Sequence, residues 1–129
     1  MNIKKYFDLA ASIADFNDNR TFMLGAVGIR SDGVLVCARN GNSFSTKWNS
    51  FHKNIKSHAE GRILRKLDCD STIFISRIKD KNTFVKAKPC DNCAVAIKGR
   101  RVYKVYYTID DECFGLWYPK QDKTIIYNF

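Results

Sequence analysis

Two short stretches constrain this chain more than any other part of its sequence. The first, Ser57–Glu60 with the sequence S-H-A-E, stands at the start of one predicted helix, and the second, Pro89–Cys93 with the sequence P-C-D-N-C, opens another. About one strand and its connecting loop separate them, so a unit of alternating strand and helix brings both helix starts to the same edge of a sheet. The sequence therefore predicts that the two stretches form one site.

The residue types in these stretches suit a zinc ion. Zinc accepts imidazole nitrogen and thiolate sulfur, and catalytic sites use three protein ligands while water takes the fourth tetrahedral position. His58, Cys90 and Cys93 supply such a set. The two cysteines stand about one helical turn apart, and the dipole at a helix N-terminus favours the thiolate form. We therefore predict a catalytic zinc site with these three ligands.

A catalytic site of this kind also needs a group that moves protons. Zinc lowers the pKa of its water to about 7. Glu60 follows His58 closely in the first turn of the predicted helix, where a carboxylate reaches that water without ligating the metal. Glu60 is therefore the predicted general acid and base.

The combination H-x-E followed by P-C-x-x-C is the signature of zinc deaminases that act on nucleobases, and the chain resembles the cytidine and deoxycytidylate deaminase superfamily. The resemblance implies one domain over residues 1–129, with a three-layer α/β/α fold around a mixed sheet of about five strands. It implies hydrolytic replacement of an exocyclic amine by oxygen, with release of ammonia. It also implies the same roles for the three zinc ligands and for Glu60.

Each part of the signature has a structural interpretation as well. A C-x-x-C pair on its own occurs in structural zinc sites and in redox pairs. Ser57 and Glu60 form a good capping box, in which Glu60 returns to the N-cap, and an isolated His58 suits a structural role. The joint occurrence of these residues in the order of the family favours the catalytic interpretation.

The resemblance also implies a set of substrate contacts. The segment 39–42 leaves a predicted strand where the family carries a turn with an asparagine that contacts the sugar, which assigns this role to Asn40 and also to Asn42. Ala59 and Pro89, which adjoin the ligands, complete the expected set of contacts. An ordinary Asn-Gly turn at Asn40 is the alternative.

Hydrophobic periodicity and turn signals predict the other elements. Asp32-Gly33 favours a hairpin, whereas the polar loop 79–88 and the turn-rich segment 110–123 receive no element. The expected elements in chain order are a helix at 3–16, strands at 23–29, 34–38 and 72–78, a helix opened by Cys90 and ended by Gly99, and strands at 102–109 and 124–127.

The formal net charge of +9 is high for a chain of 129 residues. A basic surface suits a phosphate-bearing partner, either a nucleotide or a nucleic acid, although the charges are scattered and solubility alone is the alternative. The segment 44–56 interleaves aromatic residues with lysines, which suits the stacking of unpaired bases. The alternative is that its aromatic side chains cover the core.

The remaining composition bears on location and assembly. No apolar run approaches the roughly eighteen residues of a membrane span, and no signal segment follows the N-terminus. We therefore expect a cytoplasmic protein with reduced cysteines, of which Cys37, Cys69 and Cys113 stand outside the zinc site. The apolar stretch Phe114–Tyr118 is a candidate surface for a homo-oligomer.

Two departures from the family bear on the substrate. The ligand His58 stands where free-cytidine deaminases usually have cysteine, which favours the nucleotide and polynucleotide branches. Residues 86–88 lack the hydroxyl residue or glutamate often present before the proline, so the pocket is expected to differ. The small chain favours cytosine in a free (deoxy)nucleotide, such as deoxycytidylate, as the substrate. The alternatives are cytosine or adenine in single-stranded nucleic acid or tRNA, a non-catalytic zinc-stabilised binding module, and a redox protein.

Overall fold

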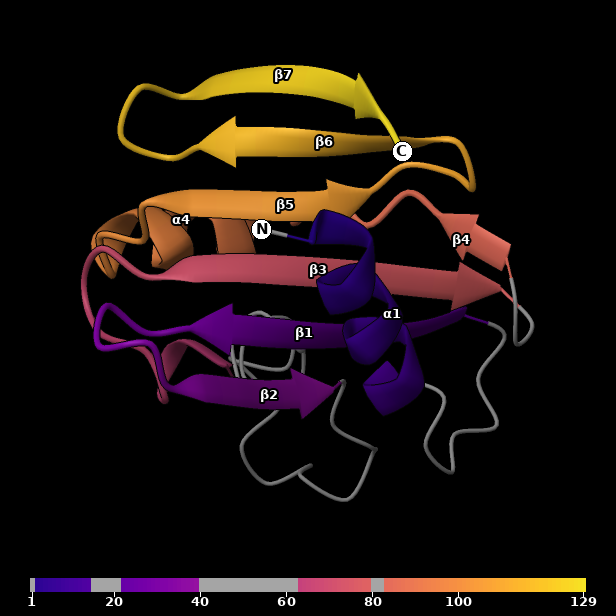
Figure 1. Cartoon of the computed structure of the whole chain (residues 1–129). Coiled ribbons are helices and arrows are strands. Elements are labelled where there is room, and N and C mark those ends of the chain that lie inside the picture. The colour runs from indigo at the N-terminus through magenta and orange to yellow at the C-terminus, as the bar shows by residue number, and fades with distance from the viewer. Residues whose placement is uncertain (1, 15–21, 40–62, 80–82) are drawn as a thin grey trace, which may run out of the picture.

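The computed structural model describes residues 2–14, 22–39, 63–79 and 83–129. Within these ranges a mixed sheet lies between helices (Figure 1). The helices are α1 (Ile3–Ala14) and α4 (Asp91–Gly99). The strands are β1 (Phe22–Ile29), β2 (Leu35–Arg39), β3 (Thr72–Lys79), β4 (Thr83–Val85), β5 (Lys104–Thr108), β6 (Cys113–Tyr118) and β7 (Lys123–Asn128).

The sheet has the strand order β2-β1-β3-β5-β6-β7, and β4 pairs with β3 outside this path. Only β3 and β5 run parallel among the described pairs, with Thr72 opposite Lys104, and the other pairs are antiparallel. Parallel strands need a crossover connection, and here that connection contains α4. A crossover helix runs back against the strands, so α4 begins toward the carboxyl ends of β3 and β5.

The two faces of the sheet bury separate apolar clusters. Figure 1 shows α1 in front of the sheet and α4 behind it. The cluster on the α1 face contains Phe7, Ala10, Val27, Phe74, Tyr106, Phe114 and Leu116. The cluster on the α4 face contains Ala26, Ile63, Leu64, Leu67, Ile73, Ile75, Ile97, Val105 and Trp117. The predicted α/β/α layers around a mixed sheet are therefore confirmed.

The described sheet has seven strands, more than the five or so expected. One addition is β4, a strand of three residues within the predicted polar loop. The other is β6, whose six residues lie in the middle of the segment 110–123 that received no element. Burial of the β6 side chains also corrects the prediction of an assembly surface at Phe114–Tyr118, because Phe114, Leu116 and Trp117 are at most 8% exposed.

The expected helix at 3–16 is described as far as Ala14, and it buries Phe7, Ala10 and Ala14. The predicted His58 helix falls mostly outside the described residues, although Ile63, Leu64 and Leu67 contribute to the core as a helical face would. No helix in the described ranges is long and apolar enough to cross a membrane.

Candidate functional site

The stretch Pro89–Cys93 lies at the start of α4, as the sequence predicts. Cys90 is the N-cap residue, with an extended backbone at φ −67° and ψ 167°. The first helical hydrogen bond runs from the backbone N–H of Ala94 to the carbonyl oxygen of Cys90, at 2.8 Å. The Cys90 side chain makes no capping hydrogen bond to this described helix. Capping therefore does not account for a thiol at this position.

The two cysteines differ in their exposure. Cys93 is fully buried, whereas Cys90 is exposed at the open end of the helix. None of the five cysteines, all within the described ranges, forms a disulfide. Two thiols about one turn apart at a helix N-terminus are suitable donors for zinc, because the helix dipole favours their ionised form. The donor set at the start of α4 therefore fits the predicted metal.

The other half of the predicted site lies outside the described residues. His58, Ala59 and Glu60 belong to it, as do the predicted sugar contacts Asn40 and Asn42. Within the described ranges, no group of three or more histidine, cysteine or acidic side chains is arranged to hold a metal ion. Cys90 and Cys93 are thus the described members of the predicted ligand set, and all three ligands stay predictions.

Thr108 positions the segment that leads to Cys90, a role that the sequence analysis missed. Its side chain is completely buried at the carboxyl end of β5. The Thr108 hydroxyl donates to the carbonyl oxygen of Val85 at 2.8 Å and accepts from the backbone N–H of Arg77 at 3.2 Å. The backbone N–H of Ala87 donates to the Thr108 carbonyl oxygen at 2.8 Å. These bonds tie β3, β4 and the approach to Pro89 to one residue.

A cavity of about 400 Å³ borders the start of α4, and we call it the Pro89 cavity. Pro89 is buried in its wall, and its role as a substrate contact stays a prediction. Tyr107 also lines the cavity, and burial raises the pKa of its hydroxyl, while a hydrogen bond with Thr124 opposes this shift. The Trp117 indole N–H donates to Asp122 Oδ1 at 3.0 Å. The residues that line the cavity are Lys88, Pro89, Asp91, Ala94, Val95, Lys98, Tyr107, Trp117, Asp122 and Thr124.

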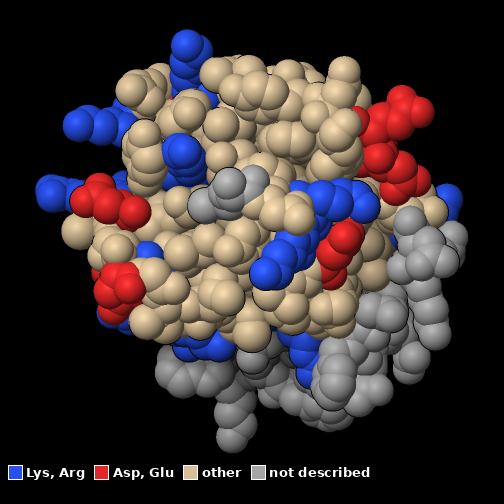
Figure 2. Space-filling model, in the orientation of Figure 1, with Lys and Arg blue, Asp and Glu red and all other residues tan. Residues whose placement is uncertain are grey.

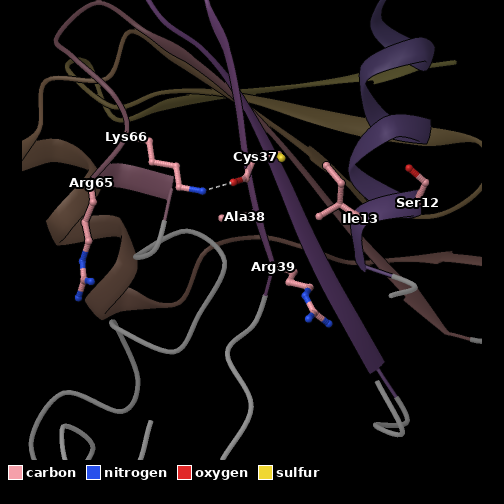
Figure 3. A pocket seen from close by; sticks show the side chains of 7 residues that line it. All are labelled: Ser12, Ile13, Cys37, Ala38, Arg39, Arg65 and Lys66. Carbon is pink, nitrogen blue, oxygen red and sulfur yellow. Dashed lines mark hydrogen bonds between the residues drawn. The ribbon is translucent and has the colours of Figure 1, made fainter. Parts of the chain in front are cut away.

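A second cavity, of about 570 Å³, lies along the edge strand β2 (Figure 3). Its described lining contains the cations Arg39, Arg65 and Lys66 and no acidic residue. Lys66 Nζ donates to the Cys37 carbonyl oxygen at 2.7 Å, as the dashed line in Figure 3 shows. Arg39 directly precedes Asn40, the predicted sugar contact. The chain is therefore electropositive where it leaves β2 toward that residue.

The positive charge is not confined to this edge. Figure 2 shows Lys and Arg side chains spread over the face that carries α1, interleaved with Asp and Glu. Cavities with an excess of cations are consequently more informative about anionic ligands than the net charge of +9.

The three-layer fold and the paired thiols at the start of the crossover helix define an α/β protein of the cytidine-deaminase class. The family described as the cytidine and deoxycytidylate deaminase zinc-binding region has a model that matches residues 1–109. Because this match spans most of the chain and both signature stretches, the chain belongs to that family. It is a deaminase of the cytidine and deoxycytidylate type.

Among solved structures, the chain is similar to the dCMP deaminase from the cyanophage S-TIM5 in its apo form. The TM-score is 0.59 at 21% sequence identity, and the alignment covers 83% of this chain and 82% of the phage protein. At this identity the likeness shows the fold. No curated protein matches the chain.

Proposed function

We propose that the chain is a zinc-dependent hydrolytic deaminase of cytosine in a free (deoxy)nucleotide, such as deoxycytidylate, and that it forms uracil with release of ammonia. The observation that carries the proposal is the pair Cys90 and Cys93 at the start of α4, in a family described as a zinc-binding region. The name of the similar phage protein, a dCMP deaminase, supports the choice of a nucleotide.

In this proposal His58, Cys90 and Cys93 hold the zinc ion. When bound, zinc would act as a Lewis acid and make water nucleophilic near neutral pH. Glu60 accepts a proton from the attacking water and delivers protons to the ring nitrogen N3 and to the amine that leaves C4. Water thereby supplies the oxygen of uracil, and the exocyclic nitrogen departs as ammonia.

The remaining predicted contacts bind the rest of the substrate. Asn40 and Asn42 contact the sugar, while Ala59 and Pro89 border the base. The buried position of Pro89 beside a cavity supports its part in this set. The three cations around the β2 edge cavity favour an anionic substrate, because one of them, Arg39, directly precedes Asn40.

Deamination of cytosine or adenine within single-stranded nucleic acid or tRNA is the second candidate function. The net charge of +9 favours it, since a polynucleotide engages more cations than one nucleotide does. The two candidates differ in their response to salt. Affinity for a strand falls steeply with ionic strength, whereas affinity for a single phosphate falls less.

The proposal is tested by ammonia release from the zinc-loaded chain with deoxycytidylate, other nucleotides and short single strands. We expect turnover of deoxycytidylate and its nearly complete loss in Glu60→Ala, which retains zinc. Glu112→Ala, which removes an exposed carboxylate from the turn before β6, is the matched control and is expected to remain active. Unchanged turnover in Glu60→Ala would exclude Glu60 as the proton carrier, and turnover of strands alone would favour the second function.

The predictions about domain, location and assembly stay proposals. We retain a single domain over residues 1–129, an intracellular protein and assembly into a homo-oligomer. The five cysteines without a disulfide support a reducing compartment. Since β6 is buried, an assembly surface has to lie elsewhere on the chain.

A further inference from the structure

A third cavity lies at the opposite end of α4 from Cys90, and we call it the Tyr103 cavity. Its volume is about 620 Å³. Since α4 has nine residues, about 13 Å of helix at 1.5 Å per residue separates the cavity from the start of α4. The lining comes from the chain before β3, the last turn of α4, the connection from α4 to β5 and the turn after β6. It consists of Cys69, Asp70, Lys98, Arg101, Val102, Tyr103, Pro119 and Lys120. These segments meet at the amino-terminal ends of β3 and β5, at the left of Figure 1.

The charges around the Tyr103 cavity favour an anion. Its described lining holds the cations Lys98, Arg101 and Lys120 and the single acid Asp70. The charge of Lys98 is partly offset, because its Nζ lies 3.7 Å from Oδ1 of Asp122. Asp122 is not part of the cavity lining. Arg101 and Lys120 are both exposed. Arginine and lysine are the side chains that bind phosphate most strongly, through charge-assisted hydrogen bonds.

An exposed aromatic ring stands beside these cations. Tyr103 is 54% exposed and belongs to the large apolar side chains that the fold leaves open to solvent. Its ring meets the Tyr118 ring edge to face at 6.0 Å between centroids, and Lys104 Nζ lies 5.2 Å from the Tyr103 centroid. These contacts orient the ring without burying it. Such a ring is a suitable platform for a planar base.

The backbone of the cavity is strained at two facing positions. Asp70 and Arg101 have φ angles of 63° and 60°, in the left-handed region that non-glycine residues seldom adopt. The Asp70 N–H donates to the Arg101 carbonyl oxygen at 2.9 Å, and the Tyr103 N–H donates to the Ser71 carbonyl oxygen at 2.8 Å. Strain of this kind is typical of ligand-binding sites. Here it fixes two lining residues before any ligand arrives.

We propose that the Tyr103 cavity is a second binding site, separate from the zinc site, for a nucleoside phosphate. Arg101 and Lys120 bind the phosphate, and Tyr103 stacks against the base. A cavity of this volume is of the size that accepts small ligands. A free nucleotide and a nucleotide within a single strand present the same chemistry, so the test distinguishes these two sources. This inference goes beyond the proposed catalytic function and does not depend on turnover.

The test measures binding of two thymine probes to the zinc-loaded full chain. Thymidine monophosphate is titrated by calorimetry, and a fluorescein-labelled strand of about ten deoxythymidines is followed by anisotropy. Thymine has no exocyclic amine, so neither probe is consumed by a deaminase. Arg101→Gly removes the guanidinium, and glycine adopts a positive φ without strain, so this variant is expected to fold. Lys5→Ala, which removes an exposed cation from α1, is the matched control.

We expect Arg101→Gly and Tyr103→Ala to weaken binding by at least about tenfold, because each removes a direct ligand contact. Lys5→Ala is expected to bind as the unsubstituted chain does. If Arg101→Gly and Tyr103→Ala weaken the binding of only one probe, the result supports the site. It then also identifies whether the phosphate comes from a strand or from a free nucleotide. Equal affinities in all variants, or no binding of either probe, would overturn the site. A chain that binds normally yet releases no ammonia overturns only the proposed catalytic function.

Discussion

One hydroxyl group, that of Thr108, holds the segment that leads to Cys90. It bonds to backbone groups of Arg77 and Val85, which belong to different strands. Thr108→Val keeps the shape but leaves both backbone groups without this partner, at an expected loss of about 1–3 kcal/mol in the free energy of unfolding. Urea denaturation measures this loss, and ammonia release from deoxycytidylate is expected to fall as the approach to Pro89 shifts.

Thr108→Ser is the matched control for this prediction. Serine retains the hydroxyl group and is expected to recover most of the stability and activity lost in Thr108→Val. Equal stability of Thr108→Val and the unsubstituted chain would show that the approach to Pro89 is positioned by other contacts.

Asp68 makes the stability of the fold sensitive to pH in the acidic range. The Ser31 hydroxyl and the Ser31 N–H both donate to its carboxylate, and these bonds lower the Asp68 pKa below its ordinary value of 3.8. A carboxylate with a lowered folded pKa stabilises the fold above the unfolded pKa and loses this effect as the pH falls through the folded pKa. Asp68→Asn is therefore expected to flatten the fall in stability below about pH 4.

Urea midpoints measured between about pH 3 and pH 7 test this dependence. Glu112→Gln removes an exposed carboxylate elsewhere and serves as the control. Glu112→Gln is expected to lose stability at low pH as steeply as the unsubstituted chain. If Asp68→Asn loses stability just as steeply, the Ser31–Asp68 contact does not contribute to the acid response.

The docking of α1 on the sheet depends on Gly25 in β1. A Cβ atom at Gly25 would collide with the carbonyl oxygen of Ala10 and lie 2.9 Å from the backbone N of Ala14. Because these are backbone atoms of α1, the helix would have to move. Gly25→Ala is expected to lower the free energy of unfolding by at least about 1–3 kcal/mol, measured by urea denaturation.

Gly28→Ala is the comparison for the same strand on its opposite face. A Cβ atom there would meet the side-chain ends of Leu67, Val36 and Ile63, at 2.6, 3.1 and 3.2 Å. Side-chain ends move more easily than a helix backbone, so this substitution is expected to cost less. A greater loss in Gly28→Ala than in Gly25→Ala would show that α1 adjusts readily.

Elements with a strong local signal could be predicted from the sequence. In the hairpin between β1 and β2, Gly33 has a φ of 89° and the Arg30 N–H donates to the Val34 carbonyl oxygen at 2.9 Å. The apolar spacing of α1 and the Pro-Cys start of α4 were equally informative. Strand β4 carries little signal of its own, because its three residues are extended through pairing with β3.

Strand β6 and the role of Thr108 depend on contacts between distant segments. Turn residues surround β6, and Gly115 interrupts its apolar pattern because the Tyr107 ring packs on that position. No sequence motif marks the role of Thr108, because the two partners of its hydroxyl group lie 31 and 23 residues earlier in the chain. In the candidate site, the sequence alone predicted the helix start and its two thiols but not the residue that positions them.

At the scale of the whole molecule, the proposed zinc ion joins two parts of the fold. Cys90 and Cys93 begin α4, whose Ile97 packs in the same cluster as Ile63 and Leu64. The third proposed ligand, His58, precedes those two residues in the chain. A metal bound by both segments would link α4 to the chain before β3 near the carboxyl edge of the sheet. Its binding free energy would then contribute to folding.

Removal of zinc with a chelator is therefore expected to lower the melting temperature by at least about 5 °C, and Cys90→Ala is expected to lose bound zinc and melt near the chelated chain. Calorimetry and metal analysis measure both effects. Cys69→Ser replaces an exposed thiol at the other end of the fold and is expected to keep zinc and stability. Stoichiometric zinc in Cys90→Ala would exclude Cys90 as a ligand. An unchanged melting temperature after complete removal of zinc would show that α4 is held by Ile97 and its apolar neighbours alone, and that any metal here serves the reaction without supporting the fold.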